Sequence, residues 1–501
     1  MPALRLSYLN LSVPLRQCFA FCAIFPKDAV IKKQLLMELW MANGFISSEE
    51  VCDQVWNELY WRSFFQDIKR DVYGNIKYFK MHDLIHDLAQ SVTSEVSCVT
   101  HRNGITTVPR GTRHLSIELC RKEEAIGLHQ VRSLKSYLGP SYYDSFGRYL
   151  PLDVLKCYSL RVLQHMSLNH LPASIADLKY LRYLNISRGN FKTLPESICK
   201  LRNLQVLNLE SCYFLETLPA CLKQLKALQH LYLTGCNELL SIPPSIGELT
   251  SLTTLSIFVL GKGTGSHLRE MGTLKLKGVL YIKRLERVTS VADAEKANMG
   301  DKQLHHLLLS WGRVEESRLQ AKDVERVLEV LQPSMHELQS LHLGGYPGVQ
   351  FPQWMGSPSL IHLREVLIVD CKNSSSLPAL RKLPSLQRLE ISNINHLMYL
   401  DKDTYDNKGA FIALECLVLN ELPNLIRLSR EEGEIMFPVL SELHFYECPK
   451  LSLPFLPSLK ELTVKGKRHQ GFLNSIYKLN GLESLAFNGS DDETPCFQDE
   501  M

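Results

Sequence analysis

Apolar residues recur along the last two-thirds of the chain in the short pattern L-x-x-L-x-L. The segments LRYLNI, LQVLNL, LQHLYL and LTTLSI begin at residues 181, 204, 228 and 252, which gives a period of 23 to 24 residues. In such a unit the x-L-x portion forms a short strand whose leucine faces the core while both x side chains face outward. Because one unit cannot bury its leucines alone, this period predicts stacked leucine-rich repeats with one continuous core.

The pattern loosens between Ile257 and Leu338 and then returns in seven segments, from LQSLHL (338–343) to LESLAF (482–487). We therefore expect an α/β chain, in which a mostly helical winged-helix domain precedes a leucine-rich-repeat solenoid (horseshoe) with a parallel sheet on its concave face. The predicted divisions are 1–95 for the winged helix, 96–158 for a linker and N-terminal cap, 159–258 for the first repeat block, 259–337 for irregular repeats or an insert, 338–488 for the second block, and 489–501 for an acidic disordered tail.

The first hundred residues follow a different pattern. Apolar spacing predicts a helix over 34–46 with Gly44 as its stop, and a second helix that begins at a serine N-cap in Ser47-Ser48. Alternating residues on both sides of Tyr73-Gly74-Asn75 predict a hairpin. Three helices followed by a hairpin are typical of a winged helix.

The segment MHDLIHDLAQ (81–90) predicts an amphipathic helix and also comes close to the zinc signature H-E-x-x-H. Its apolar stripe at helical spacing comprises Met81, Leu84, Ile85, Leu88, Ala89 and Val92. His82 and His86 are expected together on the flank, as solvated side chains or as metal ligands. The zinc alternative is the weaker one, because Asp83 is shorter than glutamate and no third ligand is identifiable.

Composition excludes several classes of protein. Lys+Arg total 56 against 53 Asp+Glu, so a net charge of +3 gives no electrostatic case for a nucleic-acid partner. No apolar run reaches the 18 residues of a membrane span. The apolar segment CFAFCAIF (18–25) directly follows Arg16-Gln17 and lacks a cleavage site, which argues against a secretory signal and for a cytoplasmic protein.

The fourteen cysteines are expected to be reduced. Cys212, Cys236, Cys371 and Cys448 each stand three residues after the last apolar residue of a strand, which is the slot where a small residue turns the backbone of a repeat. We expect them to form a ladder of free thiols. GKGTGS (261–266) is not a P-loop, because Lys262 precedes the second glycine, and the sequence gives no sign of an enzyme.

CFAFCAIFPKD (18–28), LWMANGFI (39–46) and MHDLIHDLAQ, in this order ahead of leucine-rich repeats, resemble the plant nucleotide-binding leucine-rich-repeat disease-resistance proteins of the coiled-coil type. The segments 258–278, 351–355 and 376–391 are similar to them too. The resemblance implies an innate immune receptor that recognises a pathogen effector or a host guardee, contacts other immune-receptor domains and signals defence through an ADP/ATP switch of the NB-ARC kind.

The resemblance also implies a role for the Met-His-Asp motif. His82 would face the β-phosphate of bound ADP, with Met81 and Asp83 as its packing and orienting neighbours. The family's coiled coil and G-x-x-x-x-G-K-[ST] loop have no counterpart in these 501 residues, so we expect ADP or ATP by resemblance only, and no metal.

Outward positions of the predicted strands are the candidates for binding a protein partner, and fewer than a third are expected to matter. A leucine-rich-repeat scaffold unrelated to immunity is the alternative function. The candidates are Arg182, Tyr183, Asn185, Gln205, Asn208, His230, Tyr232, His342, Arg388, Glu390, His444, Tyr446, Lys460 and Glu461.

Overall fold

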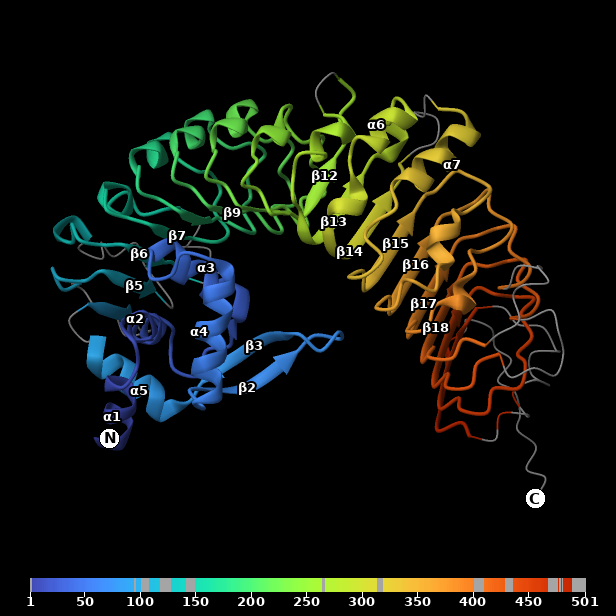
Figure 1. The fold of residues 1–501 in the computed structure, drawn as a ribbon, viewed down its shortest axis with the longest axis horizontal. Coiled ribbons are helices and arrows are strands. Elements are labelled where there is room, and N and C mark those ends of the chain that lie inside the picture. The colour runs from blue at the N-terminus through green and yellow to red at the C-terminus, as the bar shows by residue number, and fades with distance from the viewer. Residues whose placement is uncertain are drawn as a thin grey trace. The chain divides into compact units, whose positions relative to one another are not determined.

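The fold is taken from a computed structural model of the chain. It describes residues 2–93, 96–100, 108–117, 128–140, 149–263, 266–312, 319–400, 410–428, 436–466, 476, 479 and 481–488. The chain divides into a first unit, residues 1–256, and a second unit, residues 257–501 (Figure 1). Within the described ranges, no helix has both the length and the apolar character needed to cross a bilayer.

The first unit begins with the predicted winged helix. Its helices are α1 (Pro2–Leu9), α2 (Val13–Phe21), η1 (Cys22–Ile24), α3 (Lys33–Asn43), α4 (Glu49–Trp61) and α5 (Asp83–Thr93). Strands β1 (Ile31–Lys32), β2 (Phe65–Arg70) and β3 (Ile76–Met81) form an antiparallel sheet in the order β1-β3-β2.

Local sequence signals set the ends of these helices. The stop predicted at Gly44 is confirmed, since this glycine has the left-handed φ of 79° that ends α3. Ser48 caps α4 by accepting a hydrogen bond from the amide of Val51 at 3.4 Å. The predicted hairpin is β2–β3, whose turn is closed by Asp71.

An eight-stranded parallel sheet completes the first unit. Its strands are β4 (Ser97–Thr100), β5 (His114–Ile117), β6 (Ser136–Leu138), β7 (Val162–Gln164), β8 (Tyr183–Asn185), β9 (Val206–Asn208), β10 (His230–Tyr232) and β11 (Thr254–Leu255). The segment 96–158, expected as a linker and cap, thus contains three strands of the repeat sheet. Their repeats depart from the L-x-x-L-x-L spacing, which is why the sequence pattern did not reveal them.

The second unit contains a ten-stranded parallel sheet. Its strands are β12 (Ile257–Val259), β13 (Lys277–Lys283), β14 (Gln303–Ser310), β15 (Ser340–Gly344), β16 (Glu365–Val369), β17 (Arg388–Ser392), β18 (Cys416–Asn420), β19 (Glu442–Tyr446), β20 (Glu461–Lys465) and β21 (Ser484–Asn488). The segment 259–337 therefore continues the repeats through β13 and β14. The tail predicted at 489–501 lies outside the described residues.

Helices and turns connect the strands of both sheets. They are η2 (Leu128–Gln130), η3 (Val154–Lys156), η4 (Ala173–Asp177), η5 (Glu196–Lys200), η6 (Ala220–Gln224), η7 (Ile246–Glu248), η8 (Leu268–Met271), η9 (Leu285–Arg287), α6 (Val291–Glu295), η10 (Met299–Asp301), α7 (Ala321–Val330), η12 (Gln353–Gly356) and η13 (Leu380–Lys382). On one side of each sheet the strand leucines point into the core of the repeats. We call the opposite side, which carries the x side chains of the repeat pattern, the strand face.

The cysteines follow the predicted ladder with one exception. Cys212 and Cys236 are buried free thiols that donate to carbonyl oxygens of the preceding repeat, those of Ile186 at 3.5 Å and Leu209 at 3.2 Å. The prediction that no disulfide forms is wrong for Cys199 and Cys221, which are bonded to each other between η5 and η6. Both stand on the helical side of neighbouring repeats, where the period of the chain brings equivalent positions together.

Candidate functional site

His82 is the N-cap of α5. Its Nδ1 accepts a hydrogen bond from the amide of Leu84 at 3.3 Å, and its carbonyl accepts from the amides of Ile85 and His86. A neutral imidazole that accepts at Nδ1 carries its proton on Nε2, and the side chain is exposed. His82 therefore presents an N–H donor to solvent at the start of a helix. Met81 beside it is buried in the core, and Asp83 is exposed in the first turn.

The other histidine of this segment corrects the sequence prediction. His86 is only 2% exposed, and its Nε2 lies 2.8 Å from the carbonyl oxygen of Phe25. His82 and His86 therefore do not share a solvated flank, and they are not part of any metal-ligand cluster among the described residues. Leu84, predicted in the apolar stripe, is 52% exposed. The helix α5, which begins at Asp83, is oriented so that His86 and not Leu84 faces the core.

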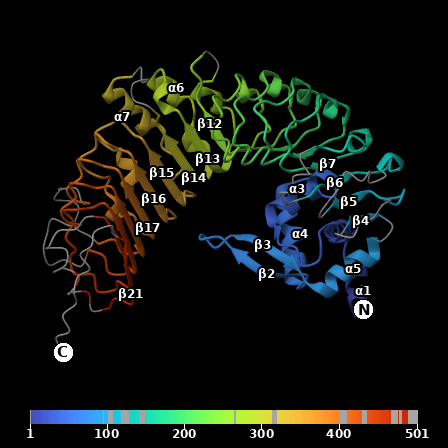
Figure 2. The ribbon, with the colours of Figure 1, turned by 180° about the vertical axis from the view of Figure 1, so that it is seen from behind.

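The winged helix lies on the strand face of the first repeats, where α3 contacts β7 and β8 and η1 contacts β4 and β5 (Figures 1 and 2). The end of α3 makes the polar contacts. The carbonyl of Asn43 accepts from the guanidinium of Arg161, and its side-chain oxygen accepts from the hydroxyl of Ser136 at 3.0 Å. The hydroxyl of Ser136 thus uses its proton in the bond to Asn43. The Nδ1 of His114 lies 3.0 Å from the hydroxyl oxygen of Ser136 and therefore acts as donor to it.

Two more polar pairs join the winged helix to the repeats, one from an earlier turn of α3 and one from α4. The hydroxyl of Tyr232 donates to a carboxylate oxygen of Glu38 at 2.6 Å, and His230 lies 3.2 Å from a carboxylate oxygen of Glu49 on α4. We call the set Glu38, Asn43, Ser136, Arg161 and Tyr232 the α3 clasp.

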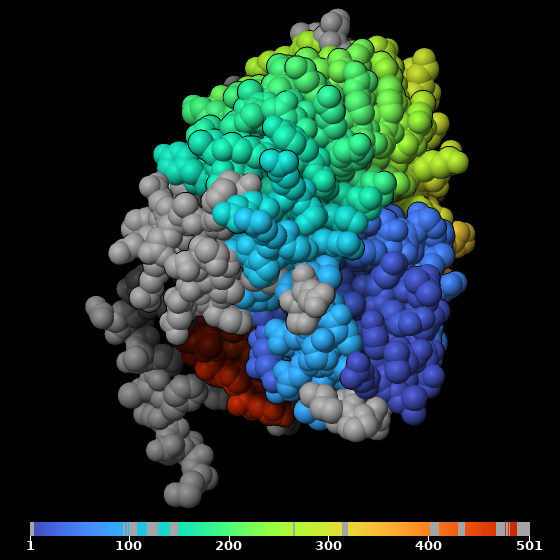
Figure 3. All heavy atoms as spheres, turned by 90° about the vertical axis from the view of Figure 1, so that its left-hand side faces the viewer, coloured from blue at the N-terminus to red at the C-terminus, as the bar shows by residue number. Residues whose placement is uncertain are grey.

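Apolar packing surrounds the α3 clasp. Leu138, Val162, Tyr183 and Val206, all on the strand face, belong to the same buried cluster as the core of the winged helix. Figure 3 shows the atoms of the winged helix, in blue, lying directly against those of the first repeats, in cyan. The first repeats and the winged helix thus share one core.

This packing corrects the expectation that outward strand residues of the first repeats face solvent. Tyr183, Asn185 and His230 are buried, at 1%, 7% and 2% exposure, because the winged helix covers them. Arg182 lies against Gly44 at the end of α3. Gln205 and Asn208 remain half-buried. Arg182, Tyr183, His230 and Tyr232 thus contact the winged helix of the same chain.

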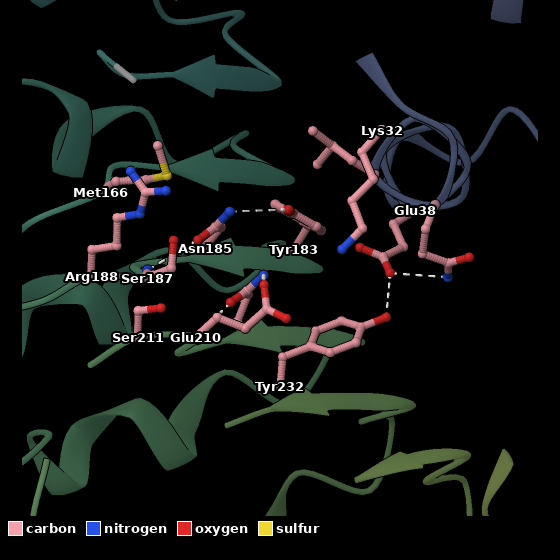
Figure 4. Close-up of a pocket in the computed structure, with 13 residues that line it drawn as sticks. Lys32, Glu38, Met166, Tyr183, Asn185, Ser187, Arg188, Glu210, Ser211 and Tyr232 are labelled. Atoms are coloured by element: carbon pink, nitrogen blue, oxygen red, sulfur yellow. Dashed lines mark hydrogen bonds between the residues drawn. The ribbon is translucent and has the colours of Figure 1, made fainter. Parts of the chain in front are cut away.

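A small polar cavity remains between the start of α3 and the strand face (Figure 4). Its volume is about 210 Å³, and both cations and carboxylates line it, among them Lys32, Glu38, Arg188 and Glu210. Ligand pockets usually measure about 300 to 1,000 Å³. The cavity is therefore suited to a few water molecules between two polar surfaces.

Burial shifts the pKa of two groups in this contact. The pKa of the Glu38 carboxyl is raised, first by desolvation, while the Tyr232 and Gln34 hydrogen bonds lower it. Desolvation, together with the nearby cations Lys135 and Arg113, lowers the pKa of His114 to about 3. His114 is thus neutral at physiological pH, with its proton on Nδ1, from which it donates to Ser136.

The strand face of the second unit carries the other candidates. None of them is buried. Arg388 forms an ion pair with Glu390 at 3.7 Å and Lys460 with Glu483 at 3.1 Å, while His342 and His444 lie 3.6 Å and 3.7 Å from carboxylate oxygens of Glu365 and Glu442. This face therefore offers half-exposed, charged side chains in consecutive repeats. The candidates on it are His342, Arg388, Glu390, His444, Tyr446, Lys460 and Glu461.

Sequence reasoning missed Glu38, Asn43, His114, Ser136 and Arg161. One signal was available: Glu38 and Asn43 are polar residues within the apolar helix QLLMELWMAN, and a buried polar residue needs a partner. The partners of these two residues lie roughly 90 and 190 residues further along the chain, beyond the reach of any local pattern.

Comparison with known proteins agrees with this architecture. Family models for the disease resistance protein winged helix domain, for leucine-rich repeats and for R13L1/DRL21 leucine-rich repeats match residues 24–89, 179–239 and 268–394. The putative disease resistance protein RGA1 of Solanum bulbocastanum is 40% identical over 99% of this chain and 48% of its own length.

Two further relatives are named in the same way. The disease resistance protein RGA2 of Solanum bulbocastanum is 41% identical over 90% of this chain and 46% of its own length. The putative disease resistance RPP13-like protein 1 of Arabidopsis thaliana is 35% identical over 93% of this chain and 47% of its own length. The chain thus spans about half the length of these relatives. It belongs to the plant disease-resistance proteins, in the group that joins a winged-helix domain to leucine-rich repeats.

Proposed function

We propose that this chain is the restraining and recognising part of a cytoplasmic plant immune receptor. The first repeats hold the winged helix through the α3 clasp. The strand face of the second unit binds a protein, either a pathogen effector or a host protein that an effector modifies. The role is one of binding, and no chemical reaction is proposed.

One contrast carries this proposal. The two repeat sheets have the same construction, yet the strand face of β6 to β10 packs on the winged helix while the candidates on β15 to β20 keep exposed surface. The second face also has the composition of protein-binding surfaces, since Tyr446 and Arg388 are of the types enriched in binding anchors. The names of the relatives favour immunity over a scaffold unrelated to it.

We also propose that His82 senses nucleotide in the receptor. The exposed Nε2–H of His82 supports a contact with a phosphate oxygen, and the amide end of α5 beside it adds a favourable partial positive charge. Such a contact would link the nucleotide state to the end of β3 and hence to the core of the winged helix.

The proposal is tested in the plant that carries the gene. Disrupting the gene should make the plant susceptible to at least one pathogen of a challenge panel that the parent resists. The intact gene should restore resistance, whereas a version with Arg388→Ala, Glu390→Ala and Tyr446→Ala should not. A matched version with Lys200→Ala, Arg202→Ala and Tyr180→Ala, all exposed residues of the first unit outside the α3 clasp, serves as control.

The possible outcomes separate the two functions. Loss of resistance in the strand-face version alone supports recognition by the second unit. Unchanged resistance in the disrupted plant, with a defect in growth or development instead, would favour the scaffold and overturn the immune function.

A further inference from the structure

The strand face of the second unit brings a thiol, a carboxylate and an imidazole together. Cys416 is the first residue of β18, and Glu442 and His444 are the first and third residues of β19. The register pairs Cys416 with Glu442, so the two side chains stand side by side, and His444 projects from the same face two residues on. Their ligand atoms all lie within 4.8 Å of one another.

These separations suit a tetrahedral ion. With bonds of about 2.3 Å to sulfur and about 2.1 Å to nitrogen or oxygen, two ligands of one zinc ion stand about 3.5 Å apart. The Nε2 of His444 and a carboxylate oxygen of Glu442 are 3.7 Å apart. Small rotations of side chains therefore suffice to place all three donors around one ion, without any movement of the sheet.

The donor types also fit zinc. Sulfur and imidazole nitrogen favour a borderline-soft ion over magnesium or calcium, which prefer oxygen alone. Three protein ligands with an open fourth position are a common zinc arrangement. Since the side chains of Glu442 and His444 are 47% and 23% exposed, the fourth position is open to water.

Charge around the three residues is compatible with a dication. Arg388 donates to the sulfur of Cys416 at 3.3 Å, but its guanidinium is neutralised by Glu365 at 3.6 Å and Glu390 at 3.7 Å. A hydrogen bond of this kind to a metal-bound thiolate also orients it. Burial raises the pKa of Cys416 to about 11, so the ion would have to displace the thiol proton.

We propose that Cys416, Glu442 and His444 form a zinc site on the strand face of the second unit. The ion crosslinks β18 and β19, two neighbouring repeats. Among the described residues one other group of possible ligands exists, Glu196 with Cys199 and Cys221. Its two cysteines are bonded to each other, so it offers no thiolate.

The test uses the full chain, freed of metal and kept free of oxygen with the Cys199–Cys221 disulfide intact, and Co²⁺ as a coloured substitute for zinc. We expect one equivalent of Co²⁺ to give the near-ultraviolet band of a thiolate-to-cobalt transition, and zinc to displace it. The band should disappear in Cys416→Ser. In His444→Gln the affinity should fall by at least about 100-fold, because losing a direct ligand costs more than losing an outer-shell partner.

His342→Gln is the matched control. His342 holds the same third position of β15, also beside a glutamate, but has no cysteine next to it. Its affinity for Co²⁺ should equal that of the unaltered chain. Glu442→Gln, a substitution at a half-exposed side chain, provides a second variant if Cys416→Ser fails to fold.

Three results would overturn the site: no thiolate band with Co²⁺, a band that persists in Cys416→Ser, or equal losses in His444→Gln and His342→Gln. A band that persists in Cys416→Ser would assign the metal to other cysteines of the chain. Because metal binding and plant resistance are measured separately, failure of the site would leave the proposed function standing.

Discussion

At the scale of single residues, Asn43 joins the two parts of the first unit. Its side-chain nitrogen donates to the backbone carbonyl of Leu39, and its side-chain oxygen accepts from Ser136. Its backbone carbonyl accepts from Arg161. The residue is buried, so each of these groups would cost free energy without its partner. One asparagine thus fixes the end of α3 against two neighbouring repeats.

Gly44→Ala should destabilise the first unit. The φ of 79° costs a residue with a Cβ about 1 to 2 kcal/mol, and the new Cβ would stand 3.3 Å from Arg161 and 3.4 Å from Arg182. Urea unfolding of the first unit should show a loss of that size or more. Gly300→Ala, where a Cβ meets nothing within 4 Å, is the control; it lies in the second unit, and an equal loss in the unfolding of that unit would contradict the explanation.

His114 should make the first unit sensitive to acid. Its pKa is about 3 in the folded protein and near 6.5 in the unfolded chain, so between these values the unfolded chain binds more protons. The stability that it contributes is complete above pH 6.5 and is lost as the pH falls toward 3. The slope amounts to at most one proton, or about 1.4 kcal/mol per pH unit.

The matched variant is His114→Asn, which retains an N–H donor for Ser136 but does not titrate. Denaturant unfolding of the first unit at several pH values should show a shallower acid slope in the variant. The two slopes would be equal if His114 were protonated in the folded state. Glu38 acts in the opposite sense, because its raised pKa gives stability that is lost as the pH rises through it.

At the scale of elements, α3 packs against two different parts of the first unit. Within the winged helix it packs on α4 and β3, and with its other side it contacts β7 and β8 of the repeats. A helix that is buried on several sides needs apolar residues nearly all round, which QLLMELWMAN has. Glu38 and Asn43 interrupt this apolar surface where polar partners from the repeats are in place.

Glu38 and Tyr232 should therefore be energetically coupled. Each of Glu38→Gln and Tyr232→Phe removes or weakens the 2.6 Å hydrogen bond, and a bond to a charged group contributes about 1.5 to 3 kcal/mol. In a double-mutant cycle on unfolding of the first unit, the combined loss should be smaller than the sum of the single losses. Strictly additive losses would mean that the bond does not form in solution.

The repeats were the most predictable elements. The leucines at 181, 184, 204 and 207 follow a period that only stacking satisfies, and all four are fully buried. The strands β4 to β6 were not predicted, because their repeats depart from the spacing. The α3 clasp could not be predicted either, since local pattern carries no information about which strand face a distant helix covers.

The start of α5 shows the same limit at closer range. The amphipathic pattern located the helix, but its buried face differs from the predicted one. Leu84 is exposed and His86 is buried. A histidine tolerates burial when a carbonyl such as that of Phe25 lies within reach, and this partner is remote in sequence.

At the scale of the whole chain, we expect weak nucleotide binding, because His82 is the phosphate contact proposed for these 501 residues. One hydrogen bond to a charged phosphate contributes about 1.5 to 3 kcal/mol, less than the 4.1 kcal/mol of a millimolar complex. Titration calorimetry of ADP into this chain should therefore detect no binding below about 1 mM. Micromolar binding that His82→Ala abolishes would show that these residues hold nucleotide by themselves.

The central claim is that the winged helix is seated on the strand face of the first repeats. Asn43→Cys with Ser136→Cys places two thiols where a 3.0 Å hydrogen bond now joins the side chains. Under mild oxidation we predict a disulfide between these positions, identified by mass spectrometry of the digested chain. The pair Asn43→Cys with Ser197→Cys, whose second position is half-buried on η5, should stay unlinked. Absence of the 43–136 disulfide, or equal bonding of both pairs, would contradict the account.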